Sequence, residues 1–353
     1  MKVVVAIDSF KGCMTSAQAN AAARDGVCSA QPDAEVVMVP VSDGGEGWID
    51  AFRSACGGVL VQAEACDPLL RPIQAHYLEL GSQAVVEVAQ ACGLTLLRAE
   101  ERNPLRASTY GVGQLIAYAY RHGCTRFLVG LGGSATSDAG QGMLEALGSL
   151  VEEMLKQNCQ FSIATDVCNP LYGPNGAAAV FAPQKGATLA IVHQLDQRAR
   201  TFAHASALRM GFDCSNRPGA GAAGGLGYAF MQYLGAQCQP GIDLLLDTIG
   251  FDALLADADV VITGEGAADR QTLMGKVPMG ILSRARRHQV PTLLVAGQVA
   301  DREALVQAGF SAAININDKR HLPLTEAMQR EVAEQQLKDA VAHAVKELFK
   351  APT

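Results

Sequence analysis

The stretch KVVVAID, residues 2–8, is a run of β-branched and other apolar residues that ends at an aspartate. A continuous apolar run of this length predicts a strand buried on both faces, as in a parallel sheet covered by helices. A second such strand is expected at residues 36–39, and helices are expected over residues 16–29 and 48–56. Thr15 or Ser16 is the expected N-cap of the first helix. This β-α-β-α order predicts an α/β fold.

The same rhythm of strands and helices returns near residue 250. The sequences DVVIT (259–263), TLLVA (292–296) and AAINI (312–316) predict three strands. Helices are expected over residues 278–288, 301–308 and 323–349. Five parallel strands from both chain ends then form a doubly wound, Rossmann- or flavodoxin-like domain of residues 1–57 and 250–353.

The middle of the chain has a different pattern. Short alternating segments such as IQAHYLEL predict neighbouring strands between residues 58 and 90. Further on, strands are expected at 126–130, 161–165 and 178–182, and helices at 110–122, 138–151, 188–208 and 223–236. Residues 58–249 are therefore expected to form an inserted mixed α/β domain. The alternative is two sequential domains divided near residue 155.

Composition excludes several classes of protein. The 353 residues carry a formal net charge of −7 and 49% hydrophobic residues, which excludes a disordered chain. The acidic balance argues against nucleic acid or an anionic membrane as partner. No apolar run reaches the length of a membrane span, and the N-terminus does not resemble a signal peptide. The ten cysteines lack C-x-x-C spacing, so reduced thiols and a cytoplasmic location are expected.

Polar, glycine-rich loops directly follow the expected strands, where open α/β sheets bind their ligands. Asp8, Ser9 and Lys11 follow the first strand, and SDGGEG (42–47), with Asp43 and Glu46, follows the second. The segment GLGGSATSD (130–138) leads from a strand into a helix, an arrangement typical of anion sites. It also fits a G-x-G-x-x-A dinucleotide fingerprint, but no acidic residue ends the next strand.

Three later loops carry further candidates. Asp166 follows a strand and could act as a base or a metal ligand, and Lys185 could meet a phosphate. The segment PGAGAAGGLG (218–227) is preceded by no expected strand, so phosphate binding and close helix packing both remain open. Glu265 follows the strand DVVIT. Carboxylates, a few cations and many backbone donors suit phosphoryl transfer.

Seven motifs follow one another along the chain: DSFKG (8–12), PVSDGGEG (40–47), GLGGSATSDAG (130–140), TDVCNPLYGPNGA (165–177), FAPQKGA (181–187), PGAGAAGGLG (218–227) and ITGEGAADRQT (262–272). In these motifs and their order the chain resembles the bacterial glycerate kinase family, of the glycerate 2-kinase type. The resemblance implies two α/β domains with the site in the cleft between them. It also implies ATP-dependent phosphorylation of D-glycerate at the 2-hydroxyl, with Mg²⁺.

The chain also departs from the family pattern. Residues 148–162 form a connection clearly shorter than is usual in the family. Ala267 stands where the family usually has Arg. Other departures are Ile7 for Pro, Ser42 for Ala, Ser137 for Asn and Ala139 for Gly.

Together, the residues and the resemblance assign expected roles. Asp166 or Asp8 is the base for the glycerate hydroxyl, Lys11 and Lys185 neutralise carboxylate or phosphate charge, and Asp166 and Glu265 hold the metal. The expected partners are D-glycerate and ATP, and a homodimer is compatible with the sequence. The alternatives are an NAD(P)-dependent oxidoreductase and a non-catalytic metabolite-binding relative. The expected substrate- and nucleotide-binding residues are Ser9, Asp43, Gly132, Gly133, Ser134, Asp138, Gly219, Gly221, Gly224, Glu265, Asp269 and Arg270.

Overall fold

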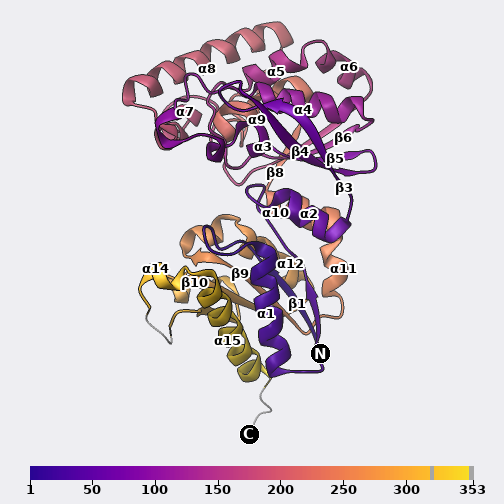
Figure 1. Cartoon of the computed structure of the whole chain (residues 1–353), viewed down its shortest axis with the longest axis vertical. Coiled ribbons are helices and arrows are strands. Elements are labelled where there is room, and N and C mark those ends of the chain that lie inside the picture. Colours follow the sequence, from indigo (N-terminus) through magenta and orange to yellow (C-terminus); the bar gives the residue numbers. More distant parts are fainter. Residues whose placement is uncertain (319–321, 350–353) are drawn as a thin grey trace. The chain divides into compact units, whose positions relative to one another are not determined.

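The computed structural model describes residues 1–318 and 322–349, which divide into two compact units (Figure 1). Unit 1 comprises Met1–Asp43, Asp50–Ala55 and the chain from Ile242 onward. Unit 2 comprises Gly44–Ile49 and Cys56–Gly241. The expected α/β fold class is confirmed, whereas the autonomy of residues 58–249 as a domain stays a prediction. No helix among the described residues has the length and apolarity needed to cross a bilayer.

Unit 1 is built on a five-stranded sheet in which every neighbouring pair is parallel. Its spatial order is β11-β10-β9-β1-β2, so the N-terminal strand lies between strands from both chain ends. The prediction of five parallel strands is therefore confirmed. The strands are β1 (Lys2–Ile7), β2 (Glu35–Met38), β9 (Val260–Ala268), β10 (Thr292–Val299) and β11 (Ala312–Asn315).

Helices cover both faces of this sheet. Along β10, Leu293 and Val295 join a core cluster with helices α1 and α15, while Leu294 packs with α12 and α13 on the other side. This alternation follows from the two-residue period of a strand. Helices α1 and α15 lie side by side (Figure 1). The helices of unit 1 are α1 (Ser16–Ala30), α10 (Gly241–Ile249), α11 (Phe251–Leu255), α12 (Val277–Arg287), α13 (Arg302–Ala308), α14 (Leu324–Ala327) and α15 (Arg330–Leu348).

Local chemistry explains how α1 begins and why it packs so closely. The Thr15 hydroxyl accepts a hydrogen bond from the Gln18 amide at 3.2 Å, and the Gln18 side chain accepts one from the Thr15 amide at 2.9 Å. This reciprocal pair is a capping box, as expected for a helix that begins after Thr15. A Cβ on Gly26 would lie 2.5 Å from the Lys338 carbonyl, so glycine permits the contact with α15.

Unit 2 contains a six-stranded mixed sheet in the order β3-β4-β5-β6-β7-β8. Pairing is antiparallel from β3 to β5 and parallel from β5 to β8. The carboxyl ends of β5, β6 and β7 therefore meet at one edge. The strands are β3 (Val59–Cys66), β4 (Pro72–Leu80), β5 (Gln83–Glu87), β6 (Arg126–Gly130), β7 (Gln160–Ala164) and β8 (Gln237–Gln239).

Two expectations for the helices of unit 2 are corrected. Residues 178–182 do not form a strand, because Ala177–Phe181 is helix α7. The helix expected at 138–151 is divided at Gly148, whose φ of 52° interrupts it. The other helices are α3 (Ala89–Cys92), α4 (Tyr110–Arg121), α5 (Gln141–Leu147), α6 (Leu150–Lys156), α8 (Leu189–Met210) and α9 (Ala222–Leu234), and α2 (Trp48–Cys56) is shared by the two units.

Candidate active site

In unit 1, two carboxylates lie at neighbouring strands. Ile7 of β1 is in register with Gly264 of β9, and the Asp8 amide donates to the Gly264 carbonyl at 2.9 Å. Asp8 and Glu265 therefore follow paired residues at the same edge of the sheet. Glu265 does not emerge from the strand as expected, because β9 continues to Ala268. Its side chain is consequently buried, with 8% of the residue exposed.

Asp8 is the most electrostatically perturbed carboxyl group of unit 1. Burial raises its pKa to about 7, and the charges of Asp43 and Glu265 act in the same direction. The Ser9 amide, which donates to Asp8 Oδ1 at 2.7 Å, and the charge of Lys11 oppose this shift. A carboxyl group with a pKa near neutrality can both accept and release a proton at physiological pH. The structure thus brings Asp8, Ser9, Asp43 and Glu265 into one electrostatic cluster.

Glu265 has two partners that the sequence analysis missed. Its Oε1 accepts a hydrogen bond from the Thr272 hydroxyl at 2.6 Å, and its Oε2 lies 3.5 Å from Lys276 Nζ. Burial nevertheless raises the pKa of Glu265, while Thr272 and Lys276 oppose the rise. The available signal was the Gly275-Lys276 pair directly before α12, since a lysine at a helix start is well placed for anions.

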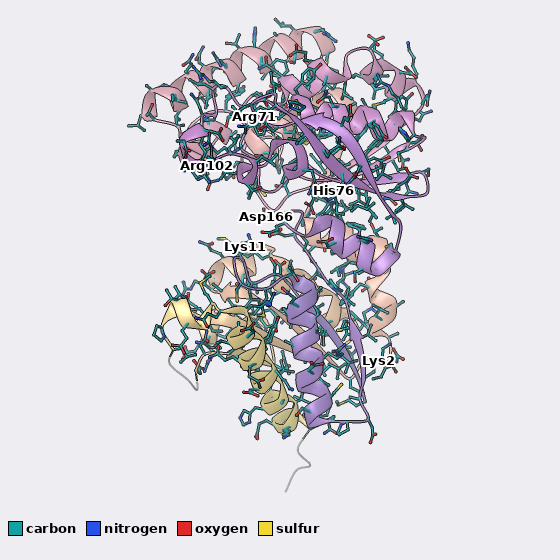
Figure 2. All side chains as sticks on the ribbon, in the orientation of Figure 1. Lys2, Lys11, Arg71, His76, Arg102 and Asp166 are labelled. Atoms are coloured by element: carbon teal, nitrogen blue, oxygen red, sulfur yellow. The ribbon has the colours of Figure 1, made fainter. Side chains whose placement is uncertain are left out.

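The other candidates of unit 1 lie on its surface. Asp269 accepts a hydrogen bond from the Gln271 amide at 2.7 Å and so caps a short 3₁₀ turn, Arg270–Met274. The Arg270 side chain is 77% exposed, and its Nε lies 3.6 Å from Asp301. Lys11 is exposed on the loop that follows β1 (Figure 2). Both cations are therefore accessible to an anionic ligand.

In unit 2, Lys185 is a buried cation. Only 3% of it is exposed, and its Nζ donates to Ser134 Oγ at 3.0 Å and to the Thr136 carbonyl at 2.7 Å. Burial lowers its pKa to about 8, against the opposing effects of Cys92 and Asp138. Lys185 forms no ion pair within residues 1–318 and 322–349. The two hydrogen bonds of Lys185 therefore hold the 134–136 segment in place.

Asp138 organises the next part of the same loop. Its Oδ2 accepts hydrogen bonds from the Thr109 amide at 2.8 Å and the Thr109 hydroxyl at 2.9 Å, and also from the Gly142 amide. Its Oδ1 accepts from the Gly140 amide at 3.1 Å. These donors lower a pKa that burial raises. The carboxylate thus ties the start of α5 to the segment before α4.

The glycine-rich loops of unit 2 pack closely against one another. A Cβ added to Gly132 would lie 2.4 Å from Gly45 Cα. One added to Gly219 would lie 2.5 Å from Cys238 Sγ, and one added to Gly221 would lie 2.4 Å from the Pro170 carbonyl. At Gly224 the clash would be with the Thr136 carbonyl, at 1.9 Å. Close packing against neighbouring protein atoms thus explains these four glycines without a ligand. Their role in binding, and that of the more open Gly133, stays a prediction.

Asp166 follows β7 in unit 2 and is exposed (Figure 2). The neighbouring Thr165 amide donates to the Gln239 carbonyl of β8 at 3.2 Å, which fixes the start of the loop. Asp166 therefore belongs to the unit of Lys185, whereas Asp8, Lys11 and Glu265 belong to unit 1.

The carboxylates of the candidate site can be compared with the ligands that a metal ion requires. No group of three or more His, Cys, Asp or Glu side chains within the described chain could hold an ion. Mg²⁺ at phosphoryl-transfer sites uses only one or two carboxylates, with waters and substrate phosphates completing its shell. Glu265, a buried carboxyl group with a raised pKa, fits that requirement because a nearby cation would favour its ionised form.

Comparisons with known proteins agree along the whole chain. The sequence model of the Glycerate kinase family matches residues 3–158 and 149–349, and the two matches meet within the short connection at 148–162. A glycerate kinase of Bacillus subtilis (strain 168) is 38% identical over 345 residues, which cover 90% of each chain. A glycerate 2-kinase of Escherichia coli (strain K12) is 36% identical over 345 residues, again 90% of each.

The fold agrees as well. A crystal structure of a protein described as glycerate kinase 2, from Salmonella typhimurium LT2, matches with a TM-score of 0.83 and 33% sequence identity. The match covers 99% of this chain and 98% of that one. From the family match, the identities and the shared fold, we conclude that this chain belongs to the Glycerate kinase family.

Proposed function

We propose that this protein transfers the γ-phosphoryl group of ATP to D-glycerate, at the 2-hydroxyl, to give 2-phosphoglycerate and ADP. The relatives named glycerate kinase and glycerate 2-kinase support the reaction and its position on the substrate. The observation that carries the proposal is the half-buried Asp8 carboxyl group directly after β1, with a pKa raised to about 7. A general base is most effective when its pKa lies near the working pH.

The sequence left Asp8 and Asp166 open as the base, and we propose Asp8. As the 2-hydroxyl oxygen of glycerate forms its bond to the γ-phosphorus, its proton passes to Asp8. The bond from the γ-phosphorus to the bridging oxygen breaks, and ADP leaves with that electron pair. Asp166 is exposed, whereas Asp8 is half-buried and its pKa is raised toward the working pH.

Each unit offers cations or backbone donors that can neutralise the charge of phosphate or carboxylate groups. We assign Lys11 and Lys276 of unit 1 to phosphate or carboxylate oxygens, since the charge of Lys11 acts on Asp8 and Lys276 lies 3.5 Å from Glu265. Lys185 holds the 134–136 segment, whose backbone we expect to face the ligand. When bound, Mg²⁺ would neutralise phosphate charge, and Glu265 is the carboxylate of unit 1 that we expect to hold it. The role of Asp166 of unit 2 as a metal ligand stays a prediction from the sequence.

The test is a coupled assay of ADP release by the purified protein, with Mg-ATP and D-glycerate. We expect release that depends on D-glycerate and falls strongly with L-glycerate, because the base must reach one face of C2. Phosphorus NMR of the product distinguishes the 2-phosphate from the 3-phosphate. Absence of turnover would overturn the proposal. Thermal stabilisation by NAD and not by ATP would then favour the oxidoreductase, and glycerate binding without turnover a non-catalytic relative.

A homodimer and a cytoplasmic location stay predictions. The first is checked by light scattering of the pure protein.

A further inference from the structure

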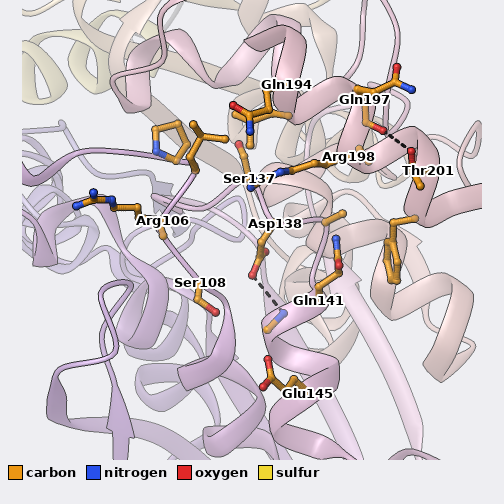
Figure 3. Close-up of a pocket in the computed structure, with 18 of the residues that line it drawn as sticks. Arg106, Ser108, Ser137, Asp138, Gln141, Glu145, Gln194, Gln197, Arg198 and Thr201 are labelled. Carbon is orange, nitrogen blue, oxygen red and sulfur yellow. Dashed lines mark hydrogen bonds between the residues drawn. The ribbon is translucent and has the colours of Figure 1, made fainter. Parts of the chain in front are cut away.

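A cavity of ≈ 840 Å³ lies in unit 2, behind the loop that Lys185 contacts (Figure 3). Its walls are the 104–108 segment, residues 137–145 and one side of α8 from Gln194 to Ala205. This volume suits a small metabolite. None of Asp8, Lys11, Asp166 and Lys185 lines it, so the residues to which catalysis is assigned above lie outside it. Asp138, which the sequence predicts as a binding residue, does line it.

One wall presents a buried hydroxyl group that has no partner. Ser137 is 8% exposed, and its Oγ is inaccessible to solvent and makes no hydrogen bond. Native proteins leave few buried polar atoms unsatisfied, and each such atom calls for an explanation. Because Ser137 lines the cavity, rotation about its Cα–Cβ bond would present the hydroxyl to a ligand there, which would then satisfy it.

The opposite wall supplies a cation. Arg198 of α8 is exposed, and Figure 3 shows its guanidinium end directed toward Ser137 and Asp138. Within the described chain Arg198 forms no ion pair, whereas Arg200 on the same helix pairs with Asp196. A second arginine of the lining, Arg106, points away from this place (Figure 3). Arg198 is thus available to an anion.

The two carboxylates of the lining do not take up this cation. Both oxygens of Asp138 already accept hydrogen bonds from Thr109, Gly140 and Gly142. Glu145 lies at the far end of the lining from Arg198 (Figure 3). The place between Ser137 and Arg198 therefore has donors in excess of acceptors.

The remaining lining indicates the shape of the ligand. Leu195, Ala199 and Phe202 form an apolar strip that can cover a short carbon skeleton, and Ser108 and Gln141 can bond to hydroxyl groups. A guanidinium group binds carboxylate and phosphate oxygens, often through two parallel hydrogen bonds.

From these observations we propose that the cavity binds a small hydroxylated anion whose carboxylate or phosphate group contacts Arg198 and Ser137. On the proposed function, substrate, product and free phosphate all share this chemistry, and the separate probes of the test distinguish them. Because Thr136, next to Ser137, accepts a hydrogen bond from Lys185, an occupied cavity would also restrain the loop held by Lys185.

The test is isothermal titration of the full chain without ATP, using D-glycerate, 2-phosphoglycerate and inorganic phosphate as separate probes. We expect at least one probe to bind with Kd below about 1 mM, and Arg198→Gln to weaken it about tenfold or more. Arg209→Gln is the matched control, because Arg209 is an exposed arginine of α8 outside the cavity. It should change Kd less than about twofold, and Ser137→Ala should weaken the same probe.

The three probes distinguish the sources of the anion, and circular dichroism checks the fold of each variant. Absence of binding by every probe at 10 mM would overturn the proposal. Equal affinities in wild type and Arg198→Gln, or equal losses in both arginine variants, would overturn it too. The readout needs neither ATP nor turnover, so a failed kinase assay and a failed cavity test remain distinguishable.

Discussion

The two units treat the carboxyl groups of their polar loops differently. In unit 1, Asp8 is half-buried beside like charges, and its pKa rises to about 7. In unit 2, Asp138 is half-buried as well and its pKa is also raised, but four hydrogen bonds from three residues oppose the rise. Close packing at glycine occurs in both units: a Cβ on Gly264 of unit 1 would lie 2.1 Å from the Val295 carbonyl, and one on Gly224 of unit 2 would lie 1.9 Å from the Thr136 carbonyl.

The difference shows that a glycine-rich, acidic loop can have either of two roles. Where polar groups are satisfied by hydrogen bonds, the loop is part of the scaffold. Where a half-buried carboxyl group remains destabilised by its neighbours, the fold holds a group suited to chemistry. We therefore place the proton acceptor in unit 1, and regard the glycine loops of unit 2 as a rigid frame around Lys185.

The largest effect is expected from Asp8→Asn. Loss of the general base should lower kcat/KM for glycerate about 10²–10⁴-fold at pH 8. Because the folded-state pKa of Asp8 is raised, its ionisation costs stability as pH rises from about 4 to 7. The variant should therefore be about 1–3 kcal/mol more stable than wild type at pH 8, as measured by urea unfolding.

The control is Asp33→Asn, which changes an exposed carboxylate of the same unit outside the seven motifs. It should keep activity close to that of wild type. If Asp8→Asn turned over glycerate as fast as Asp33→Asn, Asp8 would not be the base.

Next in size is a stability effect in unit 2. Gly224→Ala would place a Cβ 1.9 Å from the Thr136 carbonyl at a φ of +67°, and we expect a loss of about 2–4 kcal/mol. Gly235→Ala is the matched control, since Gly235 ends the same helix at a φ of +63° with no atom within 4 Å of its Cβ. It should cost about 1 kcal/mol. Equal losses in chemical denaturation would show that the packing is not close.

A smaller effect is expected from Lys185→Met. Removing the cation frees Ser134 and Thr136, so kcat/KM should fall about tenfold. Stability responds differently: the lowered pKa of Lys185 means that wild type gains stability between about pH 8 and 10.5, where only the unfolded state holds the proton. Unfolding at pH 7 and pH 10 should show this gain in wild type and not in the variant. If the Lys185→Met variant gained the same stability between pH 7 and pH 10, the gain would come from another titrating group.

The smallest effect is expected from Arg270→Gln. Its side chain is 77% exposed and its ion pair with Asp301 is loose, so the free energy of unfolding should change by less than about 0.5 kcal/mol. A KM for ATP raised severalfold would still be consistent with phosphate support. A stability loss comparable to that of Gly224→Ala would contradict the contrast between surface and packed loops.

Much of unit 1 could be predicted from sequence, because its strands are apolar runs buried on both faces. Val3, Val4 and Val5 are fully buried in β1, so composition alone marks the strand. The short run at 177–181 could not be assigned in the same way. An apolar stretch of five residues suits a helix or a strand equally, and here the Val180 amide donates to the Gly176 carbonyl to form a helical turn.

The site could be predicted only in part, and for a related reason. Position after a strand indicated Asp8 and Glu265, but it could not show that Glu265 lies inside a longer strand or that Thr272 and Lys276 contact it. Glycine content predicted close approaches without saying to what. At Gly132 and Gly224 the neighbour is the protein's own backbone, which only the tertiary structure reveals.

The most direct test of the central claim is the pH dependence of kcat/KM for glycerate-dependent ADP release by the wild-type protein. Because Asp8 must be ionised to accept the hydroxyl proton, the account predicts that kcat/KM rises about tenfold per pH unit below pH 7 and levels off above it. A value that stays constant from pH 5 to pH 8 would contradict it.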